Sequence, residues 1–266
     1  KEARELVQEA RNGVADRRAA ILAKAFRGEL TAKWREENPD VEPAEKLLER
    51  HALSTNARPS NKRRMKENPS VNVPNYSSMV PANWTYKNIR ELVGAGAIID
   101  FQDGNHGELY PRKTAFTEEG GPYLSAEGSI DGEIALNTLP KLKQSGAEGL
   151  RIGVAKGGDV ILTHNATVGR VAQIPKDTEG TIILSTSTTY FRTDPGCLLA
   201  PLLRYYFESY FFQSQLYSIM SQTTRNQVSI TKLTDFGVPV PPLEEQTFIM
   251  RALERLLESV AAAHEA

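Results

Sequence analysis

The chain contains 266 residues and, with 32 Lys and Arg against 33 Asp and Glu, carries a net charge of −1. Hydrophobic residues make up 40% and charged residues 24%, values that exclude a disordered or uniformly basic chain and fit one large or two small globular domains. Because no apolar run reaches the roughly 18–20 residues of a membrane span and the lone Cys197 excludes an internal disulfide, we expect a cytoplasmic protein with no membrane partner.

The first part of the chain is predicted to be one long helix. Val7, Val14 and Ile21 recur at intervals of seven residues, which is the spacing of a coiled-coil seam. Gly28 suits the end of this helix, so we assign residues 1–30 to the helix and its termination. Because the helix starts at Lys1 with neither Met nor a capping residue before it, we expect the chain to be a fragment of a longer protein.

Residues 31–81 differ in composition from the segments on either side. A short helix is predicted at 44–51, followed by a stretch rich in Asn, Pro, Ser and basic residues that includes the run from Lys62 to Lys66. We interpret this stretch as an exposed linker. Its charges suit phosphate contacts, which position a protein on nucleic acid without reading the sequence.

Residues 82–240 are predicted to form a β-rich domain. Short apolar runs at 97–101, 159–162, 169–174 and 181–184 alternate with turns rich in Gly and Asp. One helical insertion at 199–220 interrupts them, and its aromatic residues follow helical spacing, which indicates core packing. The expected fold class is therefore α+β.

A second long helix is predicted over residues 241–266. Glu244 and Glu245 suit its first turn, where negative charge stabilises the helix dipole. Ile249, Leu253, Leu256 and Val260 follow at spacings of four, three and four, which is again a coiled-coil seam. We expect the two end helices to pack against each other in opposite directions, or against those of a second copy.

The familiar catalytic motifs are absent from the sequence. The pair Gly94 and Gly96 lacks the third glycine of a dinucleotide-binding loop, and a phosphate-loop spacing at 153–158 is followed by Asp159 where a lysine is needed. The four histidines and the cysteine show no metal-ligand spacing, and no nucleophile-elbow motif occurs. We therefore expect a chain with no catalytic residues, no cofactor and no bound metal.

Several segments, in order, resemble the DNA-specificity subunit of type I restriction–modification systems. Residues 158–171 look like its strand–turn–strand signature, and residues 184–192 are similar to the strand that follows. Residues 211–233 resemble its helix and polar loop, and residues 239–246 resemble the Pro-rich exit into a spacer helix. Residues 21–31 are similar to the far end of such a spacer.

The resemblance implies a target-recognition domain at 82–240 flanked by two spacer-helix segments. Such a domain reads one half of a bipartite target in double-stranded DNA and has no activity of its own. The resemblance also implies two partners, a methyltransferase subunit that binds S-adenosylmethionine and a motor-nuclease restriction subunit. Family members usually carry two recognition domains, so this chain corresponds to the second half of one.

Direct reading of bases needs polar side chains on loops that reach the major groove. The loops supply a set of candidate DNA-contacting residues, which are Asn105, His106, Lys113, Thr163, His164, Asn165, Arg170, Thr223, Thr224, Arg225, Asn226 and Gln227. Among them Asn105, Asn165, Arg225 and Gln227 are expected to contact bases or support such contacts, and Arg170 suits a phosphate. For any single residue the more frequent role of Ser, Thr or Asn is to form a turn.

Two other functions are compatible with the sequence. The chain could be the specificity half of a fused methyltransferase-nuclease restriction enzyme, with its catalytic part before Lys1. It could also be a coiled-coil scaffold whose β-rich domain binds protein. Sequence-selective DNA binding by the assembled complex would exclude the scaffold.

Overall fold

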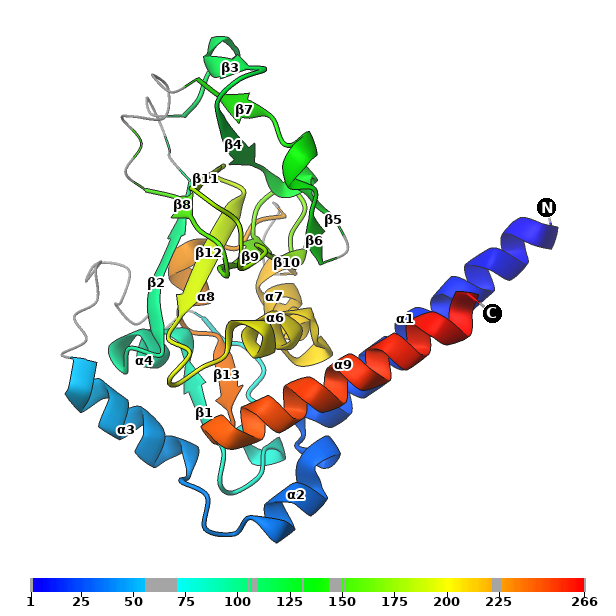
Figure 1. Ribbon diagram of the computed structural model, residues 1–266, viewed down its shortest axis with the longest axis vertical. Helices are drawn as coiled ribbons and strands as arrows, with labels where there is room; N and C mark the ends of the chain where they lie inside the picture. The colour runs from blue at the N-terminus through cyan, green and yellow to red at the C-terminus, as the bar shows by residue number, and fades with distance from the viewer. Residues whose placement is uncertain are drawn as a thin grey trace.

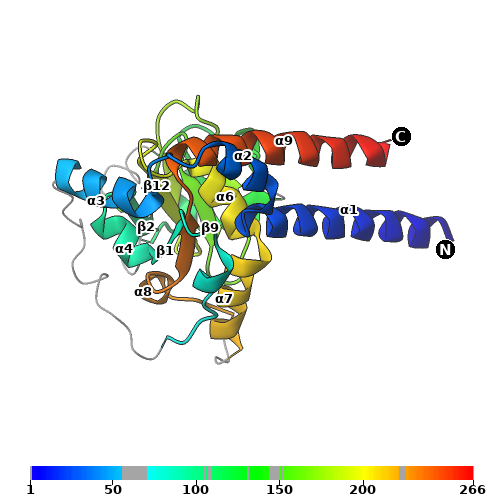
Figure 2. The same ribbon diagram turned by 90° about the horizontal axis from the view of Figure 1, so that it is seen from below.

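The computed structural model describes residues 2–55, 71–104, 106, 110–130, 132–143, 150, 152–221 and 226–265. Two long helices, α1 (Glu2–Phe26) and α9 (Leu243–Glu265), lie side by side and project from the rest of the molecule (Figures 1 and 2). Both chain ends lie at the far end of the pair, so the helices run in opposite directions (Figure 1). The predictions of a helix at each end of the chain and of their antiparallel packing are confirmed.

Among the side chains that the structure describes, the interface of this helix pair is most deeply buried where it meets the rest of the molecule. Leu22 and Phe26 of α1 are each 2% exposed, Leu253 of α9 is 0% exposed, and all three belong to the main hydrophobic core. Leu256 is 36% exposed, although its spacing places it in the same seam. The prediction of a continuous buried seam is therefore wrong at Leu256, because α9 there extends beyond the packed domain. Pairing with a second copy stays a prediction.

Two shorter helices follow α1. Helix α2 spans Ala32–Glu37 and helix α3 spans Ala44–Thr55, so the helix predicted at 44–51 is confirmed and is longer than expected. Leu47 and Leu48 of α3 are buried and attach this helix to the main core. The basic run from Lys62 to Lys66 lies outside the described residues.

The middle of the chain folds mainly into two sheets (Figure 1). The four-stranded sheet is antiparallel, in the order β10 (Val171–Gln173), β9 (Val160–Thr163), β12 (Thr188–Thr193) and β2 (Ile98–Asp103). The five-stranded sheet is mixed, in the order β3 (Phe116–Thr117), β7 (Lys141–Leu142), β4 (Gly121–Leu124), β11 (Ile182–Leu184) and β8 (Val154–Ala155). Two small pairs join β1 (Thr85–Asn88) to β13 (Gly237–Val240) and β5 (Ser129–Ile130) to β6 (Glu133–Ile134). The four predicted apolar runs are confirmed as β2, β9, β10 and β11.

The remaining α-helices in the described part of the chain are α4 (Ile89–Gly94), α6 (Ala200–Glu208), α7 (Tyr210–Met220) and α8 (Ile230–Leu233). The predicted insertion at 199–220 is thus two helices, because Ser209 between them has an extended backbone, with φ −72° and ψ 154°. The Phe207 and Phe212 rings stack with centroids 4.1 Å apart, and Phe191 of β12 meets Phe207 edge-on at 5.0 Å. The aromatic stripe is mostly core packing, as predicted, although Tyr210 is 66% exposed.

Helix α9 is fixed to the rest of the molecule by two buried polar residues in its first turn. The Glu245 carboxylate is 0% exposed, accepts a hydrogen bond from Thr31 Oγ1 at 2.6 Å and forms an ion pair with Arg35. Gln246 accepts from the Leu199 amide at 2.9 Å and donates to the Cys197 carbonyl at 2.9 Å. Glu245 therefore binds the corner between α1 and α2, and Gln246 binds the start of α6.

The helices and strands together form the α+β fold that the sequence predicts. Among the described residues, none of the helices combines the length and the apolar character that crossing a membrane requires.

Candidate nucleic-acid interface

Several predicted site residues lie at one edge of the four-stranded sheet. In its register Thr163 pairs with Thr188, and Thr189 pairs with Asp103. The carboxyl ends of β2 and β9 therefore lie beside the amino ends of β10 and β12. The loops after Asp103, after Thr163 and before Thr188 all leave the sheet at this edge.

The turn at 164–170 joins β9 to β10, and hydrogen bonds with Thr163 and Gln213 fix its backbone. The Thr163 hydroxyl oxygen accepts from the Arg170 amide at 2.9 Å, and the Gly169 amide donates to the Thr163 carbonyl at 2.9 Å. Gly169 has a φ of +92°, and a Cβ at this position would lie 2.5 Å from Gln213 Oε1. Gln213 of α7 donates to the Gly169 carbonyl at 2.9 Å, so α7 fixes the far end of the turn.

Two of the predicted DNA-contacting residues are buried beneath this turn. Thr163 is 0% exposed and His164 is 2% exposed. His164 Nδ1 lies 3.0 Å from the Val228 carbonyl oxygen, and the His164 amide donates to the Ser187 carbonyl at 3.0 Å. Both side chains are buried here and support the turn, and their direct contact with DNA stays a prediction.

The structure brings together two candidates that are distant in sequence. Asn165 and Gln227 form an isolated antiparallel bridge, and the Val228 amide donates to the His164 carbonyl at 2.9 Å. Asn165 is half-buried and its Oδ1 accepts from the Ala166 amide at 2.9 Å, whereas Gln227 is exposed. Residues 164–170 and 226–227 thus form one polar surface, which we call the paired-loop surface.

The other described candidates lie around this surface or apart from it. Arg170 is exposed, with a guanidinium nitrogen 3.5 Å from the Ala126 carbonyl oxygen, and Asn226 is also exposed. The His106 side chain is 60% exposed, and its Nε2 lies 2.8 Å from the carboxylate of the buried Asp103. Lys113 is exposed in the short 3-10 helix Lys113–Ala115 that precedes β3. Strand β3 belongs to the five-stranded sheet and lies apart from β9 and β10 (Figure 1).

Four candidates lie outside the described residues, and these are Asn105, Thr223, Thr224 and Arg225. One contributor to the site was not predicted, namely Gln213. Its position as a polar residue within an aromatic helix is the sequence signal that could have indicated a supporting role.

The titratable side chains bear on two kinds of chemistry, metal binding and nucleophilic attack by a cysteine. Within the described part of the chain, His, Cys, Asp and Glu side chains form no group of three or more that could hold a metal ion. Burial raises the pKa of the Cys197 thiol to about 12, so this thiol is protonated at neutral pH. Cys197 is therefore unsuited to act as a nucleophile.

Comparison with known protein families identifies the family of this chain. A family described as "Type I restriction modification DNA specificity domain" matches residues 81–265. The chain belongs to this family. Among curated protein sequences, no significant match to it was found.

A solved structure from a type I restriction–modification system shares the fold of this chain. A chain from a study titled "Structural basis underlying complex assembly and conformational transition of the type I R-M system" aligns with a TM-score of 0.53 at 18% identity, over 97% of this chain and 54% of that one. The HsdS subunit from Thermoanaerobacter tengcongensis aligns with a TM-score of 0.49 at 18% identity, over 96% of this chain and 52% of that one. The chain thus spans about half the length of these proteins.

Proposed function

We propose that the chain is a DNA-recognition subunit, or part of one, of a type I restriction–modification complex, and that it reads one half of a bipartite double-stranded target. The paired-loop surface is the observation that supports this proposal. Two polar loops meet there, and Arg170 and Gln227 on them are exposed. The buried Thr163 and His164 and the half-buried Gln213 hold the loop backbones in place. A site that reads bases needs such a fixed backbone, because small displacements misalign hydrogen bonds.

The side chains on this surface suit two kinds of contact. Asn165 and Gln227 carry amides, which can bind the N6 and N7 atoms of adenine with two hydrogen bonds. Arg170 suits a phosphate, which positions the domain without specifying a sequence. We propose that Thr223, Thr224 and Arg225, which directly precede Asn226 in the sequence, also contact DNA, and that Asn105 and His106 do so too.

We further propose that catalysis belongs to partner subunits. The partners would be a methyltransferase subunit that binds S-adenosylmethionine and a motor-nuclease restriction subunit. The family assignment supports this proposal, and so do the motifs, since neither a phosphate loop nor a dinucleotide loop is complete in the sequence. The purified chain should therefore neither methylate nor cleave duplex DNA.

Mutations can distinguish residues of the paired-loop surface that contact bases from those that contact phosphates. Replacing Asn165 and Gln227 together with Ala should cost about 1–3 kcal/mol of binding free energy on the specific target and little on random DNA. Replacing Arg170 with Ala should weaken binding to both DNAs alike and lower the salt slope by about one unit. Competition binding of the assembled complex at two salt concentrations measures both effects.

The same measurement can contradict the proposal. If the double variant loses equal affinity for both DNAs, the paired-loop surface contacts only the backbone. If the unmodified complex itself does not prefer any sequence, the recognition function is wrong, and the scaffold alternative gains support.

A further inference from the structure

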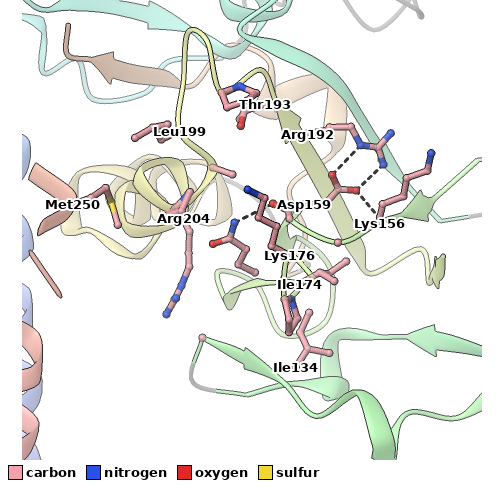
Figure 3. A pocket seen from close by; sticks show the side chains of 18 of the residues that line it. Ile134, Lys156, Asp159, Ile174, Lys176, Arg192, Thr193, Leu199, Arg204 and Met250 are labelled. Carbon is pink, nitrogen blue, oxygen red and sulfur yellow. Dashed lines mark hydrogen bonds and ion pairs between the residues drawn. The ribbon is translucent and has the colours of Figure 1, made fainter. Parts of the chain in front are cut away.

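A large hollow lies between the four-stranded sheet and helix α9 (Figure 3). Its volume is about 1030 Å³. One wall comes from the strand ends opposite the paired-loop surface, because Asp159 precedes β9, Gln173 ends β10 and Thr193 ends β12. The other wall comes from α6, which contributes Arg204, and from α9, which contributes Met250.

The floor of the hollow is largely apolar. Its apolar lining residues include Ile134, Ile174, Pro175, Leu199, Pro201 and Met250. Drug-sized ligands occupy pockets of about 300–1,000 Å³, so this hollow is at the upper limit for a small molecule and has room for a chain segment. Ile174 and Met250 are themselves buried, so the apolar surface that stays open belongs mainly to the exposed Pro175 and to the half-buried Leu199 and Pro201. This open apolar surface gains stability when apolar side chains cover it.

The rim of the hollow carries an excess of positive charge. Arg192 is turned onto Asp159, with nitrogen–oxygen distances of 2.9 and 2.7 Å (Figure 3), and Arg204 pairs with Glu208 at 2.8 Å. Three further cations line the rim, and these are Lys156, Lys176 and Arg251. They are exposed, and none of the three forms an ion pair within the described stretches of the chain. The acidic lining residue that remains to offset them is Glu254.

We propose that this hollow, which we call the basic groove, binds an acidic protein segment that also carries apolar side chains. The inference rests on the proposed function, since the segment would belong to the methyltransferase subunit. Carboxylates would match Lys156, Lys176 and Arg251, and apolar side chains would cover the floor beside Pro175 and Pro201. Phosphodiester backbone offers charge but no apolar groups, and the groove lies at the sheet edge opposite the paired-loop surface. A protein docked here would leave the proposed reading loops open to DNA.

Charge reversal tests the groove in the assembled complex. Lys156→Glu and Lys176→Glu together should raise the Kd between the chain and the methyltransferase subunit by about tenfold or more, because both lysines would then repel the acidic segment. The matched control reverses Lys46 and Lys143, which are also exposed and do not line the groove. The control pair should leave the Kd within about twofold, and circular dichroism should show that both variants are folded.

Photo-crosslinking identifies what occupies the groove. A photoreactive amino acid replaces Pro195, an exposed lining residue, in the complex with the methyltransferase subunit. Mass spectrometry should then find crosslinks to a segment of that subunit that is rich in Asp and Glu and contains apolar residues. Crosslinks to DNA alone, or to a segment without acidic residues, would overturn the proposal.

The outcomes separate this inference from the proposed function. If the unmodified complex forms and selects its target while the groove reversal leaves the Kd unchanged, the groove proposal is wrong and the recognition function stands. If the reversal instead weakens DNA binding by the chain without its partner, the groove contacts nucleic acid and the proposal is overturned. If the unmodified chain forms no complex with the methyltransferase subunit, both are wrong.

Discussion

Replacing Leu253 with Ala should lower the free energy of unfolding by about 2–5 kcal/mol. Leu253 is 0% exposed within the main hydrophobic core, and its helix α9 packs on both α1 and α6. Truncation removes buried methyl groups and leaves a cavity that the surrounding helices can only partly fill. Urea denaturation followed by circular dichroism measures the change.

Leu256 provides the matched control one turn further along α9. It is 36% exposed, so Leu256→Ala should cost clearly less, about 1 kcal/mol or below. Equal losses at the two positions would show that the far half of α9 is as well packed as the near half. A loss at Leu253 below about half a kcal/mol would contradict the burial of this interface.

Replacing Glu245 with Ala should cost about 3 kcal/mol, because the change removes one partner of a buried ion pair. Arg35, whose side chain is only 19% exposed, would lose its carboxylate, and Thr31 would lose the acceptor of its hydroxyl proton. The adjacent Glu244 is exposed, and Glu244→Ala should change stability by no more than about 0.5 kcal/mol. Thermal unfolding of the two variants compares them directly.

A second consequence of the Glu245 change concerns the direction of α9. Glu245 and Gln246 together join the helix to the α1–α2 corner and to the start of α6. Losing one of these attachments should increase amide hydrogen exchange in the first turn of α9 and at the corner near Thr31. Unchanged exchange at both places would contradict the role of Glu245 in fixing the helix.

The elements with strong periodicity were predictable from sequence. Seven-residue spacing at Val7, Val14 and Ile21 predicted α1, and the spacing of Ile249 and Leu253 predicted α9. Strands of two residues, such as β3, β7 and β8, are too short to show any alternation, so the five-stranded sheet was largely missed. The break at Ser209 was also missed, because apolar spacing continues through it.

The sequence could not show which side chains contact each other or which of them are buried. Glu245 fits a helix dipole equally well whether it is exposed or, as here, buried against Arg35. Thr163 and His164 belong to a polar turn in sequence, yet strand pairing places both of them inside. Asn165 and Gln227 were predicted separately, and only the tertiary fold sets one beside the other.

The central claim is that the paired-loop surface reads one half of the DNA target, and a map of methylated adenines tests it most directly. The complex with its methyltransferase subunit, carrying either the unmodified chain or the Asn165→Ala and Gln227→Ala double variant, would methylate genomic DNA that is then sequenced for modified adenine. The account predicts that the variant accepts more than one base pair at one or more positions in one half of the target, while the other half is unchanged. If both complexes methylated the same target with the same base preference at every position, the claim would be contradicted.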